Sequence, residues 1–88
     1  MKTVILDAKR MEEKGPAHDY LQEVLDLPDY YGGNLDALYD CLTEMNDLQI
    51  QIINSEDAEG YYPRIYDVLE EAAEENEGIS IELMEEEW

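Results

Sequence analysis

Four side chains that could bind a cationic partner recur at helical spacing in the middle of the sequence. They stand at positions i, i+3, i+4 and i+7 and are Asp36, Tyr39, Asp40 and Thr43. In a helix these positions share one face. Two carboxylates at i and i+4 repel each other mildly, so the pair costs stability unless a cationic group lies opposite. The pattern predicts either an ordinary solvated face or a face that pairs with Arg and Lys of another molecule.

The same two aspartates could instead form an acid–base pair or a metal site. Both would face solvent on a convex helix, whereas catalytic sites are usually pockets. The only histidine, His18, is expected at the surface of an earlier helix, and Cys41 has no cation near it in sequence to lower its pKa. The sequence has no phosphate-binding glycine loop and no metal-ligand spacing. We therefore expect no enzyme activity, no metal and no cofactor.

The charge of the chain favours a basic protein as the partner. The sequence has 24 acidic and 5 basic residues, which gives a net charge of −19. Four of the five cations lie within residues 1–14, so the negative charge belongs to the remainder of the chain. Such a surface repels nucleic acid and anionic membranes and attracts basic proteins. A solvated acidic surface, as in salt-adapted proteins, would have the same composition.

The elements that must position these residues alternate between strand and helix. The predicted strands are 3–8, 48–53 and 79–83. The predicted helices are 15–27, 34–45 and 63–77, with a short helical turn over 54–58. Strands separated by helices favour a parallel sheet with right-handed crossovers. We therefore expect the α/β class, with a three-stranded parallel sheet covered by helices.

One domain is expected over residues 1–88, because a chain of this length leaves no room for two. The first strand contains the most continuous apolar run, Val4-Ile5-Leu6, and is therefore expected at the centre of the sheet. The strict alternation of apolar and polar residues over 48–53 is typical of a strand with one exposed face, and indicates a sheet edge. The tail, residues 85–88, is expected to be frayed.

A cytoplasmic, monomeric protein is expected. The single cysteine excludes an intrachain disulfide, which suits a reducing compartment. The apolar run at the N-terminus stops at Asp7 and is too short for a signal peptide. No stretch approaches the length that a membrane span needs.

A longer run of residues resembles the barstar family of ribonuclease inhibitors. It reads Leu27-Pro28-Asp29-Tyr30-Tyr31-Gly32-Gly33-Asn34-Leu35-Asp36-Ala37-Leu38-Tyr39-Asp40-Cys41-Leu42-Thr43. The chain length and the order of the elements extend the resemblance over nearly the whole chain. It implies a barstar-like fold and an inhibitor that plugs the active site of a basic, secreted, guanine-preferring ribonuclease, where its acidic helix takes the place of RNA phosphates.

The resemblance also implies roles for individual residues. Asp40 would occupy the phosphate site of the enzyme, against its arginines and its catalytic histidine. Asp36 would meet a cationic side chain nearby, and Tyr30 would pack on the catalytic histidine. The further contact positions that it implies are Asn34, Tyr39, Thr43 and Glu71. Two more candidates follow from their place in the sequence: Tyr31 lies in the loop before the helix, and Glu44 lies at the rim of the helix stripe.

The sequence departs from the family pattern at positions that leave the identity of the partner open. Tyr39 stands where the namesake of the family has tryptophan, and Glu44-Met45 stands where it has Gly-Trp. The alternative interpretation is an immunity protein, or an acidic nucleic-acid mimic, that binds a basic toxin or protein other than a ribonuclease.

Overall fold

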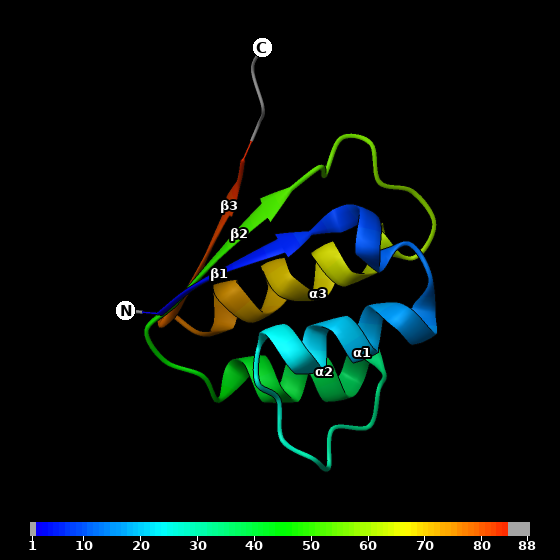
Figure 1. Ribbon diagram of the computed structural model, residues 1–88. Coiled ribbons are helices and arrows are strands. Elements are labelled where there is room, and N and C mark those ends of the chain that lie inside the picture. Colours follow the sequence, from blue (N-terminus) through cyan, green and yellow to red (C-terminus); the bar gives the residue numbers. More distant parts are fainter. Residues whose placement is uncertain (1, 85–88) are drawn as a thin grey trace.

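The computed structural model describes residues 2–84, so the expectation for the tail at 85–88 lies outside the described residues. In chain order the elements are β1 (Lys2–Asp7), the 3₁₀-helix η1 (Ala8–Met11), α1 (Lys14–Val24), α2 (Leu35–Thr43), β2 (Leu48–Ile53), α3 (Tyr62–Glu75) and β3 (Ile79–Leu83). Figure 1 shows the three strands side by side, with the helices grouped together. The predicted α/β class is confirmed. No helix within 2–84 is long and apolar enough to cross a membrane.

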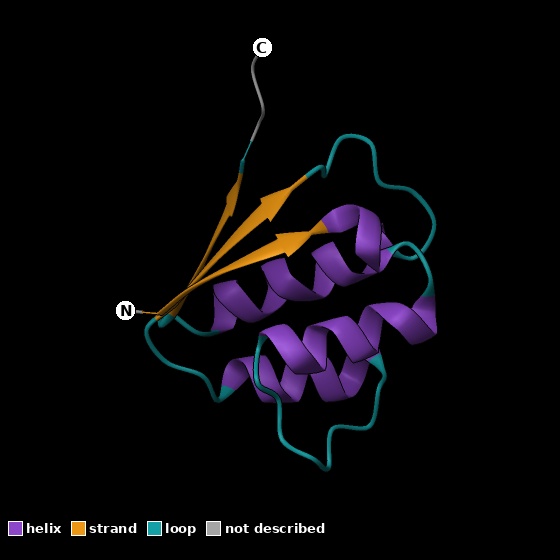
Figure 2. Ribbon diagram, in the orientation of Figure 1, coloured by secondary structure: helices purple, strands orange, loops and turns teal. Residues whose placement is uncertain are grey.

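The strands form a parallel sheet in the order β1-β2-β3, so the predicted strand order is wrong. β2 lies at the centre, and β1 lies at an edge. The helices cover one side of the sheet (Figure 2), and β2 therefore alternates although it is central. Ile50 and Ile52 are fully buried toward the helices, while Gln49 and Gln51 are only partly covered. In β1, Ile5 lies on the same open face and is 57% exposed.

The core lies between the sheet and the helices. Its largest fully buried side chains are Leu6, Met11, Leu21, Leu38, Leu42, Ile50, Ile52, Ile65 and Leu69. α1 contacts β1, α3 contacts β3, and α2 packs on α3. Each fully buried side chain of this size stabilises the fold by roughly 1.5–3 kcal/mol. The apolar faces of the three helices meet in this core.

A turn replaces the short helix expected over 54–58. Asn54 has a φ of 61°, in the left-handed region, where a helix does not start. Its side-chain amide donates to the Asp7 carboxylate (3.0 Å), which also accepts from the backbone N–H of Lys9 (3.0 Å) and so caps η1. η1 was not anticipated. These contacts connect the ends of β1 and β2, which are far apart in sequence.

Asn76, at the end of α3, holds the end of α2. Its side-chain amide nitrogen lies 3.1 Å from the carbonyl oxygen of Leu42, 3.2 Å from that of Thr43 and 2.6 Å from that of Met45. Its side-chain oxygen accepts from the backbone N–H of Gly78 (2.9 Å). The last carbonyls of a helix need partners outside the helix. One side chain thus fixes the C-terminal end of α2 against the turn between α3 and β3.

We expect Asn76→Asp to destabilise the protein by about 1–3 kcal/mol, because a carboxylate cannot donate and removes the amide donor from the carbonyl oxygens of Thr43 and Met45. The free energy of unfolding in urea measures the effect. Asn46→Asp is the matched control, since it adds the same charge at an exposed position nearby. Equal stabilities of the two variants would show that the amide does not hold α2.

Candidate partner-binding site

α2 is anchored by its N-cap and by its apolar face. The side-chain oxygen of Asn34 accepts from the backbone N–H of Ala37 (2.8 Å) and so caps the helix. Leu38 and Leu42 are fully buried, and Cys41 is nearly so. These contacts fix the rotation of α2 about its own axis, and with it the direction in which the opposite face points.

The opposite face carries the four residues predicted from their spacing. Asp36 and Asp40 are exposed, whereas Tyr39 and Thr43 are partly buried. The Thr43 hydroxyl donates to the backbone carbonyl of Asp40 (3.0 Å), so this side chain is held by the helix itself. Glu44 is exposed directly after α2 and continues the row. We call the exposed row Asp36, Asp40 and Glu44, together with Tyr39 and Thr43, the acidic stripe.

α3 adds carboxylates to the acidic stripe. Partial burial and the charges of Glu75, Glu71 and Asp40 raise the pKa of Tyr39, which places its ring among carboxylates from both helices. Glu71, a predicted contact residue, is exposed on α3, and its charge reaches Tyr39. Glu75 was missed, although its i+4 spacing from Glu71 on α3 could have revealed it. Acidic groups of both α2 and α3 thus act on Tyr39.

The loop between α1 and α2 exposes one tyrosine to solvent and keeps the next one partly buried. Tyr30 is 81% exposed, whereas Tyr31 is partly buried and its hydroxyl bonds to Nδ1 of His18. His18 is 3% exposed, so the expectation of a surface histidine is wrong. Its ring nitrogens find partners that lie 13 and 43 residues away in sequence, which periodicity along α1 could not indicate.

The groups that could do other chemistry are unsuited to it. Burial and the charges of Glu44 and Asp40 raise the pKa of the Cys41 thiol, which keeps it protonated and inert. Within the described part of the chain, no group of three or more His, Cys, Asp or Glu could hold a metal ion. The site therefore offers carboxylates and tyrosine rings, which bind cationic side chains without a metal.

A cavity of about 390 Å³ lies beside the first turn of α2. It is lined by Lys14, Asn34, Leu35, Asp36, Tyr61 and Arg64. The acidic stripe is therefore not uniform along its length. Lys14 and Arg64 line the cavity beside Asp36, whereas the charges of Asp40 and of two α3 carboxylates raise the pKa of Tyr39. Asp40 is thus placed to attract a cationic group most strongly.

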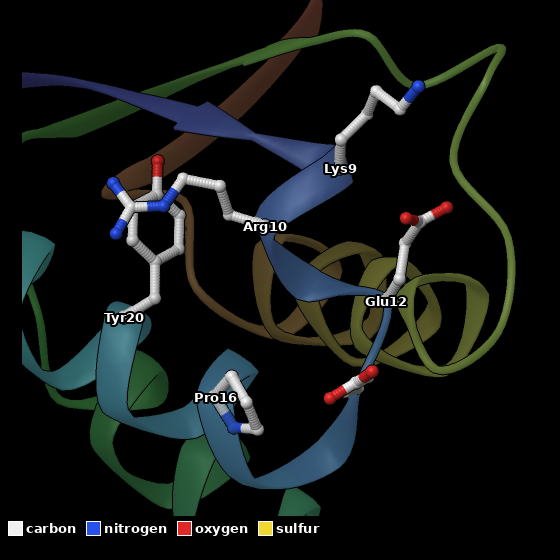
Figure 3. Close-up of a pocket in the computed structure, with 6 residues that line it drawn as sticks. Lys9, Arg10, Glu12, Pro16 and Tyr20 are labelled. Atoms are coloured by element: carbon white, nitrogen blue, oxygen red, sulfur yellow. The ribbon is translucent and has the colours of Figure 1, made fainter.

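A second pocket, of about 300 Å³, lies between η1 and α1 (Figure 3). The Arg10 guanidinium carbon lies 4.4 Å from the centroid of the Tyr20 ring, a cation–π contact. None of the residues lining this pocket belongs to α2 or α3. Its cations are thus separate from the acidic stripe.

Comparison with known proteins agrees with this geometry. The family model described as "Barstar (barnase inhibitor)" matches residues 1–84. A Bacillus subtilis (strain 168) protein named "Putative ribonuclease inhibitor YrdF" is 41% identical over 81 residues, which cover 85% of this chain and 89% of the relative. A match of this length includes every element from β1 to β3 and the whole of the acidic stripe. The chain therefore belongs to the barstar family.

Proposed function

We propose that the chain inhibits a basic, barnase-like ribonuclease by placing the acidic stripe of α2 in the cleft that binds RNA phosphates. Membership of the barstar family and the name of the 41%-identical relative support the class of target. A ribonuclease must hold a polyanion, so its cleft is lined with cationic side chains. Carboxylates on a convex helix can enter such a cleft without offering a bond that the enzyme could cleave.

The observation that carries the proposal is the position of Asp40 at the centre of an acidic surface built from two helices. Asp36 and Glu44 extend this surface along α2, and Glu71 extends it onto α3. Tyr30, Tyr31, Asn34, Tyr39 and Thr43 are the proposed contacts around it. A carboxylate in this position is desolvated on binding, where a pair with Arg or Lys is strongest.

The proposed partner is made for secretion, and the inhibitor protects the cytoplasm of the cell that makes it. Charge contributes before contact is made, because a protein with a net charge of −19 attracts a basic enzyme over several ångströms. Tyrosine rings beside the carboxylates add apolar contact area at little entropic cost. Inhibition thus needs no covalent step and no cofactor.

RNA cleavage by barnase tests the proposal, with the small basic ribonucleases of the source organism assayed beside it. We expect a stoichiometric amount of the protein to abolish cleavage by at least one of these enzymes. Full activity of all of them in excess protein would contradict the proposal. Capture of a basic toxin without ribonuclease activity from the same organism would instead favour the immunity-protein alternative.

Asp40→Ala should weaken the complex with the inhibited ribonuclease by about 2–5 kcal/mol, because it leaves cationic groups of the enzyme buried and unpaired. Glu74→Ala is the control, since it removes the same charge from the α3 face that lies toward Tyr66 and Ile81. It should cost roughly 0–1 kcal/mol. Dissociation constants measure both effects.

The melting temperature of the free Asp40→Ala variant separates binding from folding. It should equal or exceed that of the wild type, because the change relieves repulsion from Asp36 and from the carboxylates of α3. A variant that binds as the wild type does would exclude the acidic stripe as the interface. A variant that also melts much lower would show that Asp40 is structural.

Association with the inhibited ribonuclease should slow by about tenfold or more between low and near-molar salt, because charge steers the encounter. The Debye length shrinks from roughly 10 Å at 0.1 M to about 3 Å at 1 M. Stopped-flow fluorescence at several salt concentrations measures the association rate. A rate that does not change with salt would mean that the net charge has no part in recognition.

A further inference from the structure

His18 joins three segments of the chain through its two ring nitrogens. Nδ1 bonds to the Tyr31 hydroxyl, and Nε2 lies 2.8 Å from the Tyr61 hydroxyl. The histidine ring lies 5.8 Å from the Tyr31 ring at 52° and 5.4 Å from the Tyr61 ring at 66°, centroid to centroid. A hydroxyl both donates and accepts, so either tautomer of a neutral His18 satisfies both nitrogens. The three side chains form what we call the histidine clamp.

The tyrosines of the histidine clamp belong to the two segments that border the acidic stripe. Tyr31 follows the exposed Tyr30 in the loop at 25–34, which ends at the N-cap of α2. Tyr61 precedes α3 and lines the cavity beside Asn34 and Asp36. The clamp therefore joins α1 to both walls of the site at the N-terminal end of α2.

The segment of Tyr61 is itself held in place. The backbone N–H of Tyr61 donates to the carbonyl oxygen of Glu12 (2.9 Å). The preceding Gly60 has a φ of +69°, and a Cβ there would lie 2.5 Å from the same oxygen. Only glycine permits this close approach. Tyr61 thus offers His18 a fixed point near the loop that carries Tyr31. The start of this loop is also held by the Gln22 side-chain amide, which donates to the Pro28 carbonyl (3.2 Å), and by the buried Leu27.

We propose that His18 is a positioning residue of the partner-binding site, which acts through Tyr31 and Tyr61 to hold the loop at 25–34 against α2 and α3. It would present Tyr30 to the ribonuclease in a defined orientation and leave less conformational entropy to be lost on binding. The effect on affinity rests on the proposed function, whereas the order of the loop can be measured in the free protein.

The charges around His18 determine how the clamp responds to pH. Burial and Lys14 lower the pKa of His18 below 6.5, and Asp19 opposes them more weakly. Burial raises the pKa of both Tyr31 and Tyr61, so these hydroxyls stay neutral, as does the thiol of Cys41 near Tyr31. A histidine whose pKa is lowered by folding stabilises the protein above pH 6.5, and this contribution is lost as the pH falls below that value.

Amide hydrogen exchange on the free protein is the first arm of the test. The variants are His18→Phe, which keeps a ring without its nitrogens, and the milder Tyr61→Phe. Tyr66→Phe on α3 is the matched control, because its ring packs on Tyr62 instead of His18. We expect the clamp variants to raise exchange of the amides at 26–34 by about tenfold or more while β2 stays protected. Unchanged exchange, or an equal rise in β2, overturns the proposal.

A pH series in urea tests whether the buried His18 ring is held neutral, as the hydrogen bonds of the clamp and its burial require. The stability difference between wild type and His18→Phe should shrink as the pH falls from 7.5 to 5, because only the wild type loses the contribution of a neutral His18. The carboxylates titrate in both proteins and cancel in the difference. A stability difference between the two proteins that does not change with pH overturns the histidine clamp.

Affinity for barnase is the last arm, with the wild type and Tyr66→Phe as references. We expect Tyr61→Phe and His18→Phe to weaken binding by about tenfold while the acidic residues are unchanged. Raised loop exchange with unchanged affinity overturns the positioning role. Where barnase is not bound, the inhibited ribonuclease of the source organism takes its place. A wild type that binds none of these enzymes counts against the proposed function alone, since the exchange experiment still decides whether His18 orders the loop.

Discussion

The burial of one face of α2 on α3 is the contact on which the arrangement of the site depends. Leu38 and Leu42 are fully buried, so Asp36 and Asp40, on the opposite face, are directed outward. Because an α-helix is rigid over nine residues, fixing its inner face fixes its outer face as well. The carboxylates of the stripe are therefore positioned by apolar packing that they do not take part in.

Repulsion within the acidic surface destabilises the fold that carries it. Partial burial and the charges of Glu75, Glu71 and Asp40 raise the pKa of Tyr39, so negative charge from α2 and α3 acts in one region, where like charges repel one another. Apolar burial under the helices offsets this repulsion, and Asn76 stabilises the end of α2 with neutral hydrogen bonds instead of a cation. A cationic partner would neutralise this repulsion. The complex would therefore regain the stability that the repulsion costs the free protein. This coupling is common where residues are kept for binding.

The sheet explains why two expectations about the strands were wrong. Helices cover one side only (Figure 2), so a central strand alternates between apolar and polar residues as an edge strand would. The apolar run in β1 includes Ile5, which is largely exposed on the open face, and its apolarity therefore does not indicate a central position. Apolar content and alternation report burial on each face of a strand, whereas strand order depends on which strands pair.

The sequence by itself determined the three longer helices, the parallel α/β class and the side of α2 that carries Asp36 and Asp40, because periodicity is local and the family pattern is long. Only the tertiary structure placed Glu75 of α3 beside Tyr39, directed the amide of Asn76 to the end of α2, and buried His18 between two tyrosines. The hydrogen bonds among these contacts join residues that are 13 to 43 positions apart. Such pairs form only when elements pack, and no periodicity along one element specifies which distant side chain will meet it.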